Sequence, residues 1–222
     1  TPLGQITTSV FDTLDRQVAT IDPLGNRTSY SYDTADRQIA VQDALGNRTT
    51  TVYSGQNIVA TVNPLGQRTS YAYDVHNNRI AERNALDEVT TYVYGTTLDD
   101  SDVARNDLLR AEIYPDSDDV ASPLGNGVDG VFDRVEYKYN RQGERIEKKD
   151  QNGTVHAFEF DPLGRALHDR VTTLCTGIDG AVRRTSTTYE VRGMREKVTS
   201  YDNATVGSGS VVNEVLYKAL DH

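Results

Sequence analysis

The sequence contains little of what most packed domains use. Tryptophan is absent, cysteine and methionine occur once each, and hydrophobic residues make up 36% of the 222 positions. The mean hydropathy is −0.58, which is low for a packed globule of this length. The single cysteine, Cys175, excludes an internal disulfide and does not by itself make a metal site. The 13 tyrosines are instead suited to half-buried sheet faces, where the ring packs and the hydroxyl stays in water.

Basic residues and long apolar runs are also scarce. The chain has 23 Lys and Arg against 33 Asp and Glu, a net charge of −10, so we expect no nucleic-acid partner, because a phosphate-binding face needs a basic surplus. No apolar run approaches the ~20 residues of a membrane-spanning helix, so we expect no membrane insertion. The histidines lack metal-ligand spacing among themselves, and they are His76, His156, His168 and His222. We therefore expect no cofactor and no enzymatic activity.

What the sequence does contain is a short repeat. Copies begin at residues 1, 22, 43, 63 and 84, with spacings of 21, 21, 20 and 21 residues. A full copy opens with turn residues, as in Asp22-Pro23-Leu24-Gly25. The first side chain can bond the backbone of the turn, proline sets φ, and glycine accepts a left-handed conformation at low cost. This pattern predicts a type I turn followed by a bulge, which is a common hairpin connection.

A second turn follows about ten residues later, after a Tyr-Asp pair. Three residues beyond its first residue the sequence has only Asp, Asn or Gly, the types that best tolerate positive φ. These positions are Asp15, Asp36, Asn57, Asn77, Gly143, Gly164 and Gly193. Both connections are therefore predicted to be tight turns of the same kind.

Between the turns, apolar and polar residues alternate. Tyr30 and Tyr32 share one face of a predicted strand, as do Tyr71 and Tyr73. The pattern predicts an all-β fold, an antiparallel ribbon of hairpins of about 21 residues each, with strong curvature. We expect the tyrosine rings to stack on one another along the ribbon. In the alternative interpretation, these faces bind a glycan or a protein. A β-propeller is disfavoured, because its blades need roughly 40–50 residues.

The repeats divide the chain into three parts. Regular repeats occupy residues 1–95, an acidic long-loop insertion occupies 96–133, and degenerate repeats occupy 134–222. We interpret the whole as one repeat region from a longer protein, and we expect its exposed edge strands to self-associate. Most acidic residues of the insertion are interpreted as a solvated loop. A calcium site is the alternative, and its candidate ligands are Asp116, Asp118, Asp129 and Asp133.

The Tyr-Asp motifs resemble the tyrosine-aspartate repeats of RHS proteins. The resemblance is carried by Tyr32-Asp33-Thr-Ala-Asp36-Arg37, Tyr139-Asn140-Arg-Gln-Gly143 and Phe160-Asp161-Pro-Leu-Gly164-Arg165. It implies structural roles for Tyr30, Tyr32, Asp33, Tyr71, Tyr73, Asp74, Tyr137, Tyr139, Phe160, Asp161, Gly164 and Arg165.

In RHS proteins the ribbon spirals into a hollow shell, which encloses a C-terminal toxin domain in bacterial toxins. The resemblance therefore implies a structural, non-catalytic wall segment, with neighbouring repeats and an enclosed toxin polypeptide as partners. It also implies a secreted or cell-surface location in a bacterium. An extracellular glycan- or protein-binding module of the adhesin type is the alternative. The self-cleaving segment and the toxin domain of such proteins have no match in this sequence.

Overall fold

The computed structural model describes residues 6–115, 120–121, 124–125 and 133–217. In this part of the chain every regular element is a β-strand and every strand pair is antiparallel, which confirms the predicted fold class. None of the described residues forms a helix with the length and hydropathy needed to span a membrane. The chain divides into two compact units, Thr1–Val89 and Thr90–His222, and each is described by itself.

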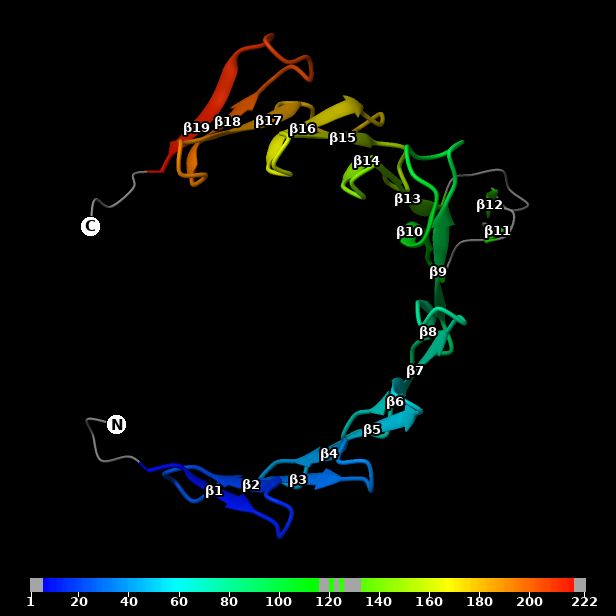
Figure 1. Cartoon of the computed structure of the whole chain (residues 1–222), viewed down its shortest axis with the longest axis vertical. Helices are drawn as coiled ribbons and strands as arrows, with labels where there is room; N and C mark the ends of the chain where they lie inside the picture. The colour runs from blue at the N-terminus through cyan, green and yellow to red at the C-terminus, as the bar shows by residue number, and fades with distance from the viewer. Residues whose placement is uncertain (1–5, 116–119, 122–123, 126–132, 218–222) are drawn as a thin grey trace. The chain divides into compact units, whose positions relative to one another are not determined.

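The first unit is a meander in which each strand pairs with the next one along the chain (Figure 1). Its strands are β1 (Thr8–Phe11), β2 (Gln17–Ile21), β3 (Arg27–Tyr32), β4 (Gln38–Gln42), β5 (Arg48–Ser54), β6 (Asn57–Val62), β7 (Arg68–Tyr73) and β8 (Arg79–Arg83).

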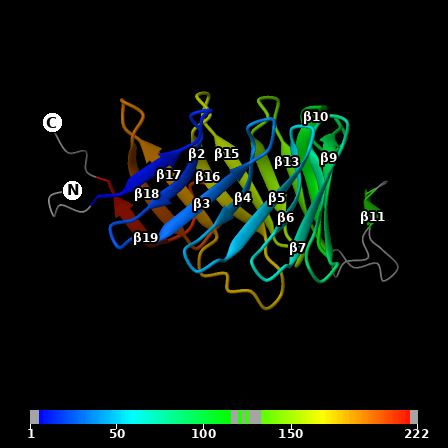
Figure 2. The same ribbon diagram turned by 90° about the horizontal axis from the view of Figure 1, so that it is seen from below.

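Successive turns of the first unit lie at opposite ends of the strands (Figure 2). We call one end the PLG margin, which carries the turns at residues 22–26, 43–47, 63–67 and 84–88. The other end is the YD margin, which carries the turns at residues 12–16, 33–37, 54–57 and 74–78.

The second unit continues the same hairpin pattern with longer connections. Its main strands pair in chain order and are β9 (Val89–Thr96), β10 (Arg105–Ile113), β13 (Arg134–Tyr139), β14 (Arg145–Lys149), β15 (Val155–Phe160), β16 (Ala166–Thr173), β17 (Arg184–Tyr189), β18 (Arg195–Tyr201) and β19 (Val211–Leu216). Two short strands, β11 (Val120–Ala121) and β12 (Leu124–Gly125), pair only with each other.

A β-bulge recurs beside each turn of the YD margin. Tyr32 pairs with Gln38 and Ser31 pairs with Ala40, so Ile39 is the extra residue. The same offset leaves Val18, Val59, Ile80, Ile146 and Leu167 as extra residues in their hairpins. The strict alternation predicted for these strands is therefore wrong at one position in each. A bulge bends its strand and increases the local twist, so every such hairpin is bent at the same place.

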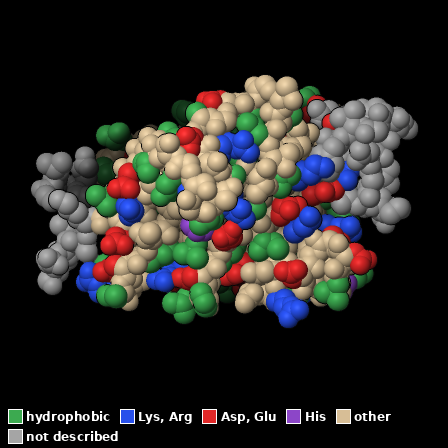
Figure 3. All heavy atoms as spheres, turned by 90° about the horizontal axis from the view of Figure 1, so that it is seen from above, with side chains coloured by type: hydrophobic (Ala, Val, Ile, Leu, Met, Phe, Trp, Pro, Cys, Tyr) green, Lys and Arg blue, Asp and Glu red, His purple; other side chains and the backbone are tan. Residues whose placement is uncertain are grey.

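Little hydrophobic surface is fully buried. In the first unit the buried apolar residues among those described are Ala19, Ala40 and Ala60, at 0%, 3% and 0% exposure, and they recur with the repeat. The second unit buries Val135, Tyr137 and Tyr139 against side chains that include Leu108 and Leu109. On the face drawn in Figure 3, acidic and basic side chains are interspersed. Hydrogen bonds must therefore supply much of the order that a core supplies elsewhere.

Backbone conformation confirms the predicted turns, with one exception. Gly25, Gly46 and Gly66 have φ of 86°, 88° and 79°. Positive φ also occurs at Asp15, Asp36, Asn77, Gly143, Gly164 and Gly193. The prediction is wrong for Asn57, which lies in β6 and pairs with Ser54. That hairpin is one residue shorter and turns at Gly55, with φ of 57°, as in a type II′ turn. The shorter hairpin explains the single spacing of 20 residues.

The conformational requirement for glycine can be measured alone at Gly66. A Cβ added there meets no atom within 4 Å, so Gly66→Ala should destabilise the chain by about 1 kcal/mol through the positive φ alone. Asp15→Gly should instead raise stability slightly, because Asp15 already has φ of 60°. Urea unfolding measures both free energies. Equal stability of Gly66→Ala and the parent chain would contradict the argument.

Candidate functional site

Turns at both margins carry the same side-chain cap. Oδ1 of Asp33 accepts hydrogen bonds from the backbone N–H groups of Ala35 at 2.8 Å and Arg37 at 3.0 Å. Equivalent bonds, to the third and fifth residues of the turn, are made by Asp12, Asp22, Asp43, Asn63, Asp74, Asn84, Asn140, Asp150 and Asp161. One polar side chain thus satisfies two backbone donors in each of these turns.

In most caps the second polar atom of the capping side chain bonds to the side chain of the fifth residue of the turn. When the first residue is Asp, the side chain of the fifth residue donates to it in every turn but that of Asp150, whose fifth residue is Thr154; Arg37, for example, donates to Oδ2 of Asp33 from Nε at 2.8 Å. When the first residue is Asn, the fifth residue accepts, as Glu88 accepts from Nδ2 of Asn84 at 2.6 Å. The donors are Arg16, Asn26, Arg37, Asn47, Asn78 and Arg165, and the acceptors are Gln67, Glu88 and Glu144. This complementarity was not predicted, although the paired choice of first and fifth residues is visible in the sequence.

Tyrosine hydroxyls connect each hairpin of the YD margin to the one before it. The hydroxyl of Tyr32 donates to the backbone oxygen of Gln17 at 2.8 Å. The corresponding bonds run from Tyr53 to Gln38, Tyr73 to Ile58, Tyr139 to Leu109 and Tyr189 to Ala166, at 3.2, 2.8, 2.6 and 2.9 Å. The tyrosine that directly precedes the turn therefore ties its own hairpin to its predecessor.

Arginine provides the complementary contact on the same tyrosines. The guanidinium carbon of Arg16 lies 5.1 Å from the ring centroid of Tyr32, and that of Arg37 lies 4.5 Å from the ring of Tyr53. Arg165 lies 4.5 Å from the ring of Tyr189 in the second unit. These distances suit cation–π interactions. Arg37 thus caps its own turn and also contacts the next tyrosine.

The predicted stacking of tyrosine on tyrosine is not what the structure has. In the described part of the chain the rings contact guanidinium groups, and the aromatic pair that stacks is His156 with Phe158, at 6.1 Å between centroids. The strand geometry gives the reason. Equivalent tyrosines lie two strands apart, roughly 10 Å, which is too far for ring stacking and leaves room for an arginine between them.

The structure also places the remaining residues for which a structural role is predicted. The hydroxyls of Tyr30 and Tyr71 pair with the hydroxyls of Thr20 and Thr61, while the hydroxyl of Tyr137 donates to Glu112 and that of Tyr139 donates to the backbone oxygen of Leu109. Asp74 and Asp161 cap turns, and Arg165 donates to Asp161. Phe160 lies opposite Ala166 in the sheet, and Gly164 has positive φ. They form a repeated set of contacts and do not converge on one point. Burial, followed by the charge of Glu112, raises the pKa of Tyr137 well above its ordinary value.

The sequence profile of the RHS repeat matches residues 11–56. Residues 11–56 therefore carry an RHS repeat. The matched segment includes the Asp12 and Asp33 caps, two bulges and the Arg16–Tyr32 and Arg37–Tyr53 contacts. In this segment the aspartate, tyrosine and arginine side chains make contacts within the chain, at turns and between neighbouring hairpins. A comparison with curated proteins gives no significant match.

Solved structures similar to this chain come from Tc toxins. One is the Photorhabdus luminescens Tc holotoxin pore with the mutation TccC3-D651A, at 15% identity over 95% of this chain, with a TM-score of 0.38. A second is TcdB2-TccC3-TEV, at 13% identity over 97% of this chain, with a TM-score of 0.38. A third is TcdB2-TccC3 without its hypervariable C-terminal region, at 13% identity over 96% of this chain, with a TM-score of 0.35. This chain spans 14% of the length of each of these three.

The histidines and the candidate metal ligands do not form a common site in the part of the chain that the structure describes. His156 Nδ1 lies 2.7 Å from Asp169, and His168 Nδ1 lies 2.9 Å from Ser186, so both bond across strands. No group of three or more His, Cys, Asp or Glu with metal-binding geometry occurs among the described residues. The calcium site stays an untested prediction, because Asp116, Asp118 and Asp129 lie outside the described residues while Asp133 lies within them.

Acid should weaken the RHS caps. Hydrogen bonds from the side chains of Asn26 and Asn47 hold the pKa of Asp22 and Asp43 below the ordinary value of 3.8, and the Arg37 side chain does the same for Asp33. A carboxyl with a lowered folded-state pKa stabilises the fold fully above its unfolded pKa, and this stabilisation is lost as pH falls through the folded pKa. We therefore expect the melting temperature to be flat from pH 7 to about 5 and to fall below about 4.

A neutral cap provides the control for the acid experiment. Asp43→Asn with Asn47→Gln recreates the Asn63–Gln67 pair, whose amides do not titrate. This double variant should lose less of its melting temperature between pH 5 and pH 3 than the parent chain. An identical loss in both proteins would show that the caps do not cause the acid sensitivity.

The complementarity of first and fifth residues can be tested at Asn84 and Glu88. Asn84→Asp replaces a donor with a carboxylate facing Glu88, and should cost about 1 kcal/mol of unfolding free energy. Adding Glu88→Asn should recover most of this loss, because the new pair matches Asp22 with Asn26. Urea unfolding of both single variants and the double variant gives the coupling energy. Additive effects would contradict the donor–acceptor rule.

Proposed function

We propose that this chain is a structural, non-catalytic wall segment of an RHS-type shell that encloses or presents a partner polypeptide. The observation that carries the proposal is the repeated cap and contact set of the YD margin. Its tyrosine hydroxyls bond backbone oxygens, its aspartates cap turns, and its arginines cover tyrosine rings. Residues that could form a catalytic site or bind a sugar are thus engaged in holding neighbouring hairpins together.

The proposal extends to the organisation and location of the chain. Residues 1–95, 96–133 and 134–222 are proposed to be parts of one RHS region, with neighbouring repeats as the principal partners. A toxin polypeptide is the proposed enclosed partner, and the proposed location is outside or on the surface of a bacterial cell. Support comes from the RHS match at residues 11–56 and from strand pairing that continues through each unit.

The adhesin-type alternative receives less support where it relies on the tyrosines. A sugar that stacks on an aromatic ring needs an open ring face. The guanidinium groups of Arg16 and Arg37 already lie over the rings of Tyr32 and Tyr53. Glycan binding by this face would first have to displace those contacts, which include the cap of Asp33.

The wall proposal can be tested on the gene product that contains this chain. We expect electron microscopy to show a hollow particle, and an adjoining polypeptide to resist a trypsin concentration that digests it when expressed alone. The triple variant Tyr32→Phe, Tyr53→Phe and Tyr73→Phe removes three interhairpin bonds and should make digestion at least about tenfold faster, since cleavage follows the opened population.

Tyr217→Phe is the matched control, because Tyr217 lies beyond β19 and is 46% exposed. It should leave the digestion rate unchanged. A particle without an interior, or a polypeptide digested equally fast inside and outside the particle, would overturn the wall proposal.

A further inference from the structure

The arginines of the first unit fall into two groups. Four pair with carboxylates within 4 Å, and these are Arg16, Arg37, Arg79 and Arg83. The other three, Arg27, Arg48 and Arg68, are exposed and have no carboxylate partner among the described residues. We call these three the arginine row. In a chain with a net charge of −10, unpaired arginines that recur at one position of a repeat are unexpected.

The arginine row is a consequence of the cap rule. At the YD margin the fifth residue of a turn is often arginine, and the first aspartate neutralises it, as in Asp33 with Arg37. In the first three turns of the PLG margin the fifth residue is an amide that completes the cap, and arginine comes one position later, at the start of a strand. There Arg27 and Arg68 donate from Nε to the hydroxyls of Ser29 and Ser70 at 3.2 and 3.1 Å. The serine holds the side chain while the terminal nitrogens face solvent.

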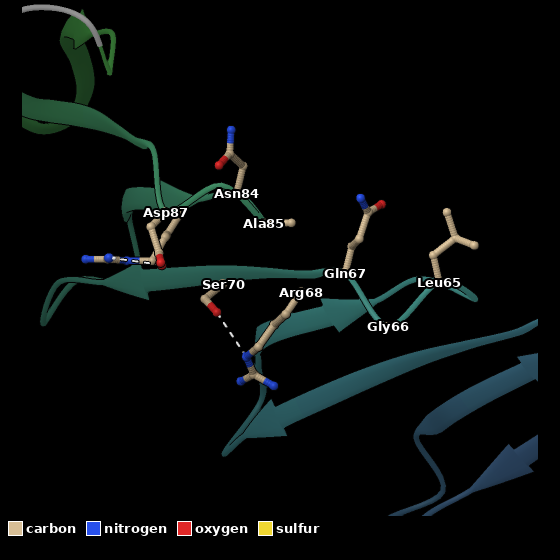
Figure 4. Close-up of a pocket in the computed structure, with 9 residues that line it drawn as sticks. Leu65, Gly66, Gln67, Arg68, Ser70, Asn84, Ala85 and Asp87 are labelled. Carbon is tan, nitrogen blue, oxygen red and sulfur yellow. Dashed lines mark hydrogen bonds and ion pairs between the residues drawn. The ribbon is translucent and has the colours of Figure 1, made fainter.

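A row of exposed leucines follows the same margin. Leu24, Leu45 and Leu65 are 87%, 88% and 82% exposed, and each lies three residues before an arginine of the row. Figure 4 shows Leu65 projecting from the tip of its turn, while Arg68 lies back along the strand beside Ser70. An isolated exposed leucine is ordinary, but these three, with Leu86 at 76% exposure in the fourth turn, form a regular apolar series at one repeat position.

Clefts lie between neighbouring turns of the PLG margin. One cleft of about 480 Å³ is lined by residues that include Arg27, Ser29 and Gln42. The other, of about 420 Å³, has Arg68, Ser70 and Arg83 at the equivalent positions, and Leu65 also lines it (Figure 4). Successive arginines of the row lie two strands apart, or roughly 10 Å. The arginines and leucines thus repeat at a constant step along the margin, and two of the three arginines line a cleft.

We propose that the PLG margin of the first unit binds an extended polypeptide segment that carries acidic and apolar side chains. The inference deepens the proposed function and rests on it, because it names the chemistry of the partner polypeptide and the surface that contacts it. Three residues in the extended polyproline II conformation cover roughly 9 Å and return to the same face of the chain, so an acidic residue at every third position would meet successive arginines. Its apolar neighbours would contact the leucines.

The two rows together favour a polypeptide over other polyanions. A nucleic acid or an acidic polysaccharide would use the arginines but would leave the exposed leucines without an apolar partner. A polypeptide can supply a carboxylate and an apolar side chain within the same three residues. Guanidinium groups also bind carboxylates through two parallel hydrogen bonds, which adds geometric specificity.

The experiment uses the 222-residue chain and a fluorescent synthetic peptide of five Asp-Leu-Ser repeats. We expect binding in fluorescence anisotropy that weakens as salt is added, because exposed ion pairs are screened. Replacing aspartate with lysine in the peptide should abolish binding. Replacing leucine with serine should weaken it. Alginate and single-stranded DNA serve as competitors, and displacement of the peptide should require a large excess of either.

Matched variants locate the site on the chain. Arg27→Gln, Arg48→Gln and Arg68→Gln together should weaken peptide binding by about tenfold or more, at about two- to fivefold per exposed pair. Leu24→Ser, Leu45→Ser and Leu65→Ser together should also weaken it. The control Arg79→Gln, Arg105→Gln and Arg192→Gln removes the same charge from arginines that have carboxylate partners, and should bind like the parent chain. Circular dichroism checks that all variants keep their β-structure.

Three results would overturn the inference. These are no binding of the Asp-Leu-Ser peptide, equal weakening by the row and control triples, and binding of alginate or DNA in preference to the peptide. If any of them occurs while the parent particle still protects its polypeptide from trypsin, the inference fails and the wall proposal stands. If the parent particle protects nothing, the wall proposal fails whatever the peptide does.

Discussion

The structure depends on the hydrogen bonds that one side chain makes to the backbone of its own turn. A sheet with so few buried apolar residues cannot rely on a core to fix the path of the chain. Each turn therefore has to be specified locally, and the first residue does this by accepting from the third and fifth N–H groups. Tyrosine and arginine side chains then connect neighbouring hairpins. Each hairpin is therefore stabilised by its nearest neighbours, as expected of a repeat protein.

The cap also determines which charged groups remain available to a partner. A cap of Asp with Arg neutralises the arginine within the turn and places it over a tyrosine ring, as Arg37 shows. A cap of Asp with Asn contains no cation. The arginine then stands one position later in the sequence, at the start of the strand, where it is exposed, as Arg27 is. The Asp12 and Asp33 turns of the YD margin thus differ in chemistry from the first three turns of the PLG margin through the choice of the fifth residue. At the YD margin Arg16 and Arg37 are engaged in contacts within the chain, whereas the PLG margin presents exposed guanidinium and leucine side chains.

Local features of the fold could be predicted from the sequence, whereas features set by register could not. Gly25 and Gly66 indicate their turns because positive φ favours glycine, and alternation around Tyr30 indicates a strand. The bulge at Ile39 needs the pairing of Tyr32 with Gln38, which no short-range pattern specifies. For the same reason the alternating tyrosines indicated ring stacking where Arg16 in fact contacts Tyr32. The arginine row was missed because an unpaired charge is recognised only when its neighbours are known.

The one irregular repeat shows how the arginine row keeps its step. Its 20-residue spacing results from a residue missing at the YD margin, where the chain turns at Gly55. On the other side of β5 and β6 the pairing is unaffected: Arg48 still pairs with Gln42, and Arg68 pairs with Val62. Arg48 and Arg68 therefore lie two strands apart, as Arg27 and Arg48 do. The deletion shortens only the margin at which hairpins contact one another, so a ligand along the PLG margin would meet an unbroken series of sites.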